Sequence, residues 1–161
     1  MATESASGAV RARIEEFLLD YVHRIDDGDL QGWPDFFTEN GTYKIVTREN
    51  FEAGLPLGIL FCEGRGMMAD RILALETANI FEPHTYCHLQ SRPSLIVDPG
   101  GRYKARTNFS VIRTMQDGTS QIFATGKYLD VIVLEDGRPL LAERLVVLES
   151  RRVDILLVYP L

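Results

Sequence analysis

The sequence predicts an α+β domain in which a strongly curved, mainly antiparallel sheet wraps around three N-terminal helices. In the first half of the chain, apolar residues recur at three- and four-residue steps, the spacing of an amphipathic helix. Beyond His84 apolar and polar residues alternate, which is typical of half-buried strands. Helices followed by a run of strands favour packing of the helices on one face of the sheet.

The first predicted helix covers residues 8–27 and has a single apolar face. That face consists of Val10, Ile14, Phe17, Leu18, Tyr21, Val22 and Ile25. Gly28 can take the left-handed conformation that ends a helix, and the Asp29 carboxylate can cap the next one. A short second helix is therefore predicted around Leu30, Trp33, Phe36 and Phe37.

Two strands and a third helix are predicted next. Residues 42–47 are β-branched and aromatic, and residues 57–62 are more apolar, so both segments are strand candidates. Residues 66–80 are predicted to be helical because one face collects Met68, Ile72, Leu75, Ala78 and Asn79.

Three long antiparallel strands complete the prediction. They cover residues 103–111, 119–134 and 139–149. The first alternates apolar and polar residues, and Asp117-Gly118 and Asp136-Gly137 are strong hairpin signals between the three. Pro99-Gly100-Gly101 is interpreted as a turn because strand-like sequence flanks it.

Length and composition indicate one domain outside the secretory pathway. We expect a flexible terminus at residues 1–7 and a single domain at residues 8–161, with no transmembrane segment and a cytoplasmic location. A net charge of −6 disfavours a nucleic-acid partner, since such binding depends on clustered Lys and Arg. Cys62 and Cys87 are predicted to be free thiols.

Residues with catalytic potential are present but form no complete site in the sequence. His84 and His88 lie four apart, which could place two imidazoles on one face, yet no carboxylate is positioned by spacing to complete a metal-binding triad. A Rieske cluster needs two Cys and two His in paired motifs, which the chain lacks. Several side chains could supply acid–base chemistry in a pocket: Tyr21, Tyr43, Tyr86, His84, His88, Asp70 and Asp130. Tyr43, His84 and His88 are the main pocket candidates.

The C-terminal segment stays apolar to the last residue, which is unusual for a terminus. Its candidates for a subunit interface are Leu156, Val158, Tyr159, Pro160 and Leu161. An apolar end implies docking, either against the chain's own sheet or against another subunit. The sequence leaves both possibilities open.

Several segments together resemble the small (beta) subunit of aromatic-ring-hydroxylating dioxygenases. In order, they are residues 33–38 (WPDFFT), 48–50 (REN) with 54–56 (GLP), 68–72 (MADRI), 78–84 (ANIFEPH), 126–130 (GKYLD) and 160–161 (PL). Within that family the chain is similar to small subunits that serve aromatic acids, of the salicylate 5-hydroxylase, terephthalate dioxygenase and anthranilate dioxygenase kind.

The resemblance implies a cystatin-like or NTF2-like cone and a structural function. It implies that small subunits form a homotrimer within an alpha3beta3 complex and support the catalytic large (alpha) subunits. Those large subunits would hold a Rieske 2Fe-2S cluster, a mononuclear iron and the substrate. The small subunit would then carry no cofactor, metal ligand or catalytic residue of its own.

Two other classes of function remain open at the level of sequence. The same cone hosts stand-alone isomerases and dehydratases, for which Tyr43, His84 and His88 would be the pocket residues. A small-molecule binding module is the third possibility.

Overall fold

The computed structural model describes residues 6–78, 81–149 and 159–161. The elements, in chain order, are α1 (Gly8–Asp26), the 3₁₀ helix η1 (Trp33–Phe36), β1 (Phe37–Thr47), α2 (Arg48–Glu52), β2 (Leu60–Glu63), α3 (Gly64–Ala78), β3 (His84–Gln90), β4 (Ser94–Val97), β5 (Tyr103–Met115), β6 (Ser120–Glu135) and β7 (Arg138–Leu148). The predicted α+β class, with helices first and a strand meander afterwards, is confirmed.

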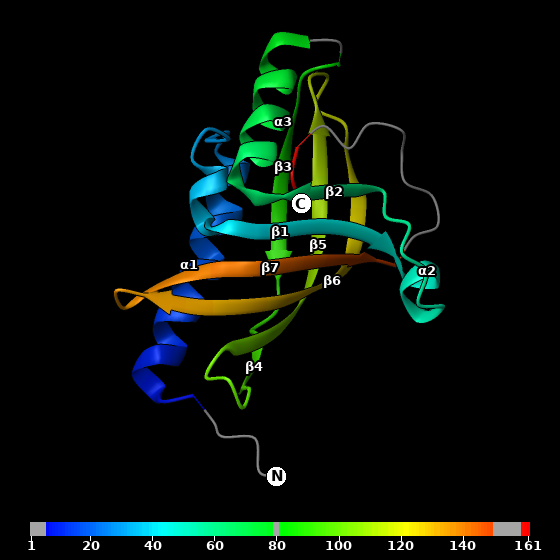
Figure 1. The fold of residues 1–161 in the computed structure, drawn as a ribbon. Helices are drawn as coiled ribbons and strands as arrows, with labels where there is room; N and C mark the ends of the chain where they lie inside the picture. Colours follow the sequence, from blue (N-terminus) through cyan, green and yellow to red (C-terminus); the bar gives the residue numbers. More distant parts are fainter. Residues whose placement is uncertain (1–5, 79–80, 150–158) are drawn as a thin grey trace.

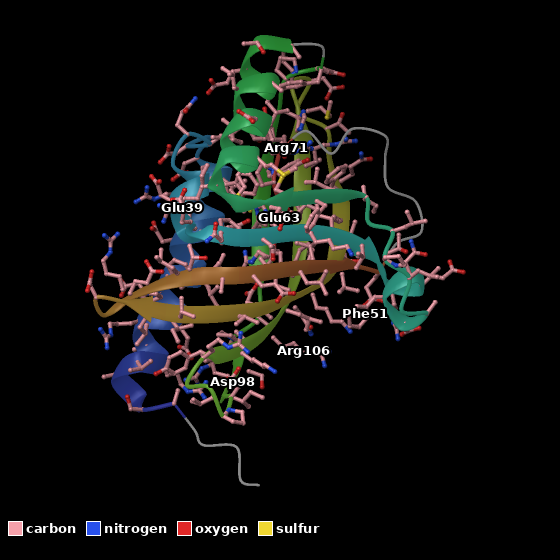
Figure 2. All side chains as sticks on the ribbon, viewed as in Figure 1. Glu39, Phe51, Glu63, Arg71, Asp98 and Arg106 are labelled. Atoms are coloured by element: carbon pink, nitrogen blue, oxygen red, sulfur yellow. The ribbon has the colours of Figure 1, made fainter. Side chains whose placement is uncertain are left out.

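One seven-stranded sheet forms the frame of the molecule. Its order is β2-β1-β7-β6-β5-β3, with β4 on β5, and β1–β7 is parallel while the other pairs are antiparallel. Figure 1 shows β1 and β7 running horizontally across the view and β3 and β5 running vertically, so the sheet is strongly bent. Figure 2 shows the side chains on the same view of the ribbon. The bend produces the concave side on which α1 packs against β3 and β7.

Helix α1 forms where its apolar face predicts it. The Ser7 hydroxyl accepts a hydrogen bond from the backbone N–H of Val10 at 3.4 Å, which caps the first turn. Gly28 ends the helical segment with φ of +81°. The buried face is Ile14, Leu18, Tyr21, Val22 and Ile25, as predicted.

The second predicted helix is present as a 3₁₀ helix and is shorter than predicted. Residues 33–36 form a single 3₁₀ turn, and Phe37 already belongs to β1. Pro34 has no backbone N–H, and Trp33, Phe36 and Phe37 are all buried, so the segment turns tightly to direct its rings into the core. The Asp29 carboxylate does accept from the backbone N–H of Gly32, at 3.3 Å.

Other boundaries differ more modestly. Helix α3 starts at Gly64, and β2 covers Leu60–Glu63 rather than residues 57–62. Helix α2 was not predicted: the Thr47 hydroxyl caps it by accepting from Asn50 N–H at 3.2 Å, and Arg48 pairs with Glu52 one turn later.

The strand hairpins follow the predicted turns. Asp136 and Gly137 have φ of 49° and 76°, the pair of positive values that a two-residue hairpin requires, and Gly118 has φ of 88°. Gly101 also has positive φ, in the predicted turn between β4 and β5. Inward residues of β5 are buried as the alternation predicts: Ala105, Thr107, Phe109 and Val111.

Among the described residues, none of the helices combines the length and the apolar character needed to cross a membrane.

Candidate functional site

The last residue of the sequence lies inside the cone. Leu161 is fully buried, its backbone N–H donates to the hydroxyl of Tyr43 at 2.8 Å, and that hydroxyl donates to the Leu161 carbonyl oxygen at 3.1 Å. The Tyr21 hydroxyl donates to the same oxygen at 3.2 Å and accepts from Nε1 of Trp33 at 2.9 Å. Three aromatic side chains from α1, η1 and β1 therefore hold Leu161 in the interior.

A buried ion pair fills the neighbouring part of the interior. Arg144 of β7 donates from Nε and Nη2 to the two carboxylate oxygens of Asp130 on β6, both at 2.9 Å, and neither side chain is exposed. The guanidinium carbon lies 4.1 Å from the ring centroids of both Tyr21 and Tyr128. Such stacking provides a cation–π environment for an arginine that has lost its contact with water.

The protonation states of the buried tyrosines oppose a role as general base near pH 7. Burial raises the pKa of Tyr21, Tyr43 and Tyr128 above its usual value near 10, so all three phenols stay neutral. Burial also raises the pKa of Asp130 against the opposing charge of Arg144. Burial lowers the pKa of Arg144, but the Asp130 carboxylate outweighs it, and the net shift is upward.

His88 is part of a second polar contact, between β3 and the end of α1. Asp26 accepts from the backbone N–H of His88 at 2.8 Å through Oδ2, and its Oδ1 contacts Nδ1 of the ring. The His88 side chain is fully buried, while that of Asp26 retains 16% exposure. This pair ties the C-terminal end of α1 to the sheet.

His84 lies instead at the edge of a pocket of about 390 Å³, between the end of α1, α3 and the start of β3. Its Nδ1 is 2.8 Å from the carbonyl oxygen of Glu82. The ring packs against those of Phe81, Tyr86 and Tyr159, with centroids 5.8, 5.4 and 4.9 Å away. The three pocket candidates are thus separated in function: Tyr43 holds Leu161, His88 pairs with Asp26, and only His84 lines this pocket.

The described residues include no cluster of three or more His, Cys, Asp or Glu that could hold a metal ion. Cys62 is buried and Cys87 is exposed, and both are free thiols, as predicted. The residues present therefore do not fit a Rieske cluster, which requires two Cys and two His together.

The predicted interface segment is only partly described. Leu156 and Val158 lie outside the described residues. Pro160 and Leu161 are buried within their own chain, and Tyr159 is half-buried at the pocket. Docking against the chain's own core is thus observed for the last two residues, and the contact with another subunit stays a prediction.

Sequence reasoning missed Asp26 and Arg144 as interior polar residues. Tyr21 and Asp130 are among the predicted acid–base groups, and the structure places both in the interior, where Tyr21 contacts Leu161 and Asp130 contacts Arg144. Asp26 and His88 are 62 residues apart, so no spacing signal connects them.

Tyr43→Phe is expected to lower the free energy of unfolding by about 1–3 kcal/mol, because it leaves the buried N–H of Leu161 without its acceptor. Urea denaturation measures the loss. Tyr103→Phe is the matched control, since Tyr103 is half-buried and its hydroxyl has no hydrogen bond within the described part of the chain. Equal stabilities of the two variants would contradict the anchoring of Leu161.

Comparison with known proteins gives consistent matches over most of the chain. The model of the SnoaL-like domain matches residues 7–144. The anthranilate 1,2-dioxygenase small subunit of Burkholderia cepacia is 38% identical over 142 residues, which cover 88% of each chain. Subunit beta 1 of the terminal oxygenase component of terephthalate 1,2-dioxygenase from Comamonas sp. is 36% identical over 149 residues, covering 92% of this chain and 97% of that one.

A solved structure also matches over most of the chain. It is from Novosphingobium aromaticivorans and is assigned as the beta subunit of an aromatic-ring-hydroxylating dioxygenase. It superposes with a TM-score of 0.86 at 31% identity and covers 95% of this chain and 97% of that one.

Proposed function

We propose a function for this chain from its family: the chain belongs to the SnoaL-like domains and, within them, to the small subunits of aromatic-ring-hydroxylating dioxygenases. It serves as a noncatalytic structural subunit of a Rieske non-heme iron oxygenase. Its partner is a catalytic large subunit that hydroxylates an aromatic acid and carries the 2Fe-2S cluster and the mononuclear iron. Three small subunits associate within an alpha3beta3 complex in the cytoplasm.

The filled interior of the cone is the observation that carries this proposal. Related cones that act as enzymes need a vacant concave side for a substrate. Here Leu161, held by Tyr21 and Tyr43, and the Arg144–Asp130 pair occupy that side. The side chains best suited to chemistry are thereby engaged in holding the fold together.

The charge of the pocket beside His84 supports the same conclusion. Anthranilate and terephthalate, which appear in the relatives' names, are carboxylates. Asp26, Asp27, Asp29 and Glu76 line this pocket, and no Lys or Arg does so among the described residues. An aromatic acid would be repelled there, so the substrate of the complex binds elsewhere.

A stand-alone isomerase or dehydratase is less consistent with the geometry. Tyr43 would be its pocket acid, yet its hydroxyl both accepts from and donates to the backbone of Leu161. His84 lines the pocket between α1, α3 and β3, whereas Tyr43 and His88 do not.

Co-expression with a large subunit tests the proposal. We expect the chain to co-purify with the large subunit in a defined complex, and to contain no stoichiometric iron when purified alone. In the complex, Tyr43→Phe should leave kcat unchanged at a temperature where the variant is folded, because Tyr43 acts only on stability. Iron in the isolated chain, or loss of turnover in folded Tyr43→Phe, would overturn the proposal.

A further inference from the structure

The pocket beside His84 has a charge distribution suited to a cation. Asp26, Asp27, Asp29 and Glu76 line it. Arg24 lies outside the lining and is 3.5 Å from Asp29, and Gln31 donates to Glu76, so neither contact places a positive charge inside the pocket. Asp26 is also engaged, by the backbone N–H and the ring of His88, and Arg113 acts on Tyr86 from outside the lining. Among the described residues, the lining itself still holds four carboxylates and no Lys or Arg.

The end of α1 strengthens this field. Residues 25–27 form the last turn and the C-cap of a 19-residue helix, and they contribute to the pocket lining. The carbonyl groups at a helix C-terminus carry a partial negative charge, which stabilises a nearby cation. Helix and carboxylates therefore act in the same direction.

Part of the pocket lining is aromatic. The centroid of Tyr159 is 4.9 Å from that of His84, 5.2 Å from that of Tyr86 and 5.9 Å from that of Phe81. Rings offer a negative face to a cation, and arginine, with its flat guanidinium, is well suited to stack on such a wall.

Two polar atoms of this wall make no hydrogen bond of normal geometry within the described part of the chain. The Nε2 atom of His84 is buried and has no hydrogen-bond partner among the described residues, and Nδ1 faces the carbonyl of Glu82, which makes Nε2 the acceptor in the neutral ring. The hydroxyl of Tyr86, a residue only 5% exposed, also lacks a hydrogen bond of normal geometry. Burial raises the pKa of Tyr86, which Arg113 and the nearby backbone of Tyr159 oppose. These atoms can accept hydrogen bonds, so the wall suits a ligand that donates N–H groups.

We infer that this pocket receives an arginine side chain of the catalytic large subunit and is one of the contacts that fix the two subunits together. The inference rests on the proposed function, which supplies the partner. The charge of the pocket selects the guest, and the volume of about 390 Å³ leaves room for a guanidinium and its stem. Tyr159, which the sequence places in an interface segment, would touch that guest.

Removing two negative charges from the pocket lining tests the inference. The pocket variant combines Asp27→Asn with Glu76→Gln, which keeps the size of both side chains and the contact of residue 76 with Gln31. The control variant combines Glu135→Gln with Asp136→Asn in the exposed turn between β6 and β7, and removes the same two negative charges. The dissociation constant of the large–small complex is measured for both at low and high salt, and melting temperatures confirm that both fold.

We expect the pocket variant to bind the large subunit about tenfold more weakly at low salt, with a smaller salt dependence, and the control to bind normally. Normal binding by the pocket variant would overturn the inference and leave the proposed function intact. If the unaltered chain fails to bind any large subunit, the inference and the proposed function are both wrong. If the variant loses only self-association in sedimentation, the guest comes from a second small subunit and the inference is wrong.

N-acetylarginine amide provides an independent probe of the isolated chain. It should shift the amide resonances of residues that line the pocket, whereas N-acetylnorleucine amide, which has a similar stem and no charge, should not. Shifts of equal size for both probes, or none for either, would contradict a site selective for a guanidinium.

Discussion

Asp130→Asn is expected to destabilise the protein by about 3–5 kcal/mol, one of the largest losses available from a single substitution in this chain. The change leaves the guanidinium of Arg144 buried, unexposed to water and without a compensating charge. Tyr21 and Tyr128 on either side can stack with the cation but cannot neutralise it. Urea denaturation and the melting temperature both report the loss.

Asp20→Asn is the control for this experiment. Asp20 pairs with Arg24 on the surface of α1, where the two side chains are 51% and 46% exposed, so the loss should stay below about 1 kcal/mol. Replacing both buried partners, with Asp130→Leu and Arg144→Met, should recover much of the stability, because no isolated charge remains. If Asp130→Asn lowers the free energy of unfolding by less than about 1 kcal/mol, Asp130 and Arg144 do not form a buried ion pair in solution.

Gly126→Ala is expected to cost about 3 kcal/mol or more, or to prevent folding. A Cβ atom at Gly126 would lie 2.1 Å from the carbonyl oxygen of Val147 and 3.2 Å from the Cα of Leu148. Both obstacles are backbone atoms of β7, so a side chain cannot rotate away to relieve the clash. Glycine is required here because the backbones of β6 and β7 approach each other closely at this position.

Gly66→Ala is the matched control, since nothing lies within 4 Å of a Cβ at that position in α3. It should leave stability unchanged or raise it by up to about 1 kcal/mol, as expected for Gly→Ala within a helix. Melting curves of the two purified variants provide the comparison. A folded Gly126→Ala protein of normal stability would mean that β6 and β7 have freedom to separate.

The sequence predicted the elements whose signals are local. The apolar face of α1, the alternation along β5 and the Asp136-Gly137 turn each depend on residues that are close in the chain, and all are confirmed. The short helix α2 was not predicted because its apolar content is low. Thr47 as the capping residue and the Arg48–Glu52 spacing are nevertheless visible in the sequence as capping and pairing signals.

The interior ion pair shows why the candidate site was harder to predict. The turn sets Glu135 opposite Arg138, and simple continuation of this register would place Asp130 opposite Glu143. A bulge between Val131 and Ile132 shifts the register by one residue and brings Arg144 opposite Asp130 instead. Because neighbouring residues of a strand point to opposite faces, this single extra residue also turns Arg144 into the cone.

The pocket beside His84 was beyond any local signal. It combines the end of α1, a turn of α3, the start of β3 and Tyr159 near the end of the sequence. Only the folded sheet brings these four segments together. The sequence could identify His84 as chemically notable, but not the carboxylates that surround it.

The hydrogen bonds that hold Leu161 have a practical consequence for experiments. Trp33 is the only tryptophan in the chain, it is fully buried, and its indole N–H reaches Leu161 through a single intervening phenol, that of Tyr21. Ultraviolet emission excited at the indole band therefore comes from one site, two hydrogen bonds away from the final residue. The protein thus contains an intrinsic fluorophore beside Leu161, and undocking of that residue can be followed in real time without any attached dye.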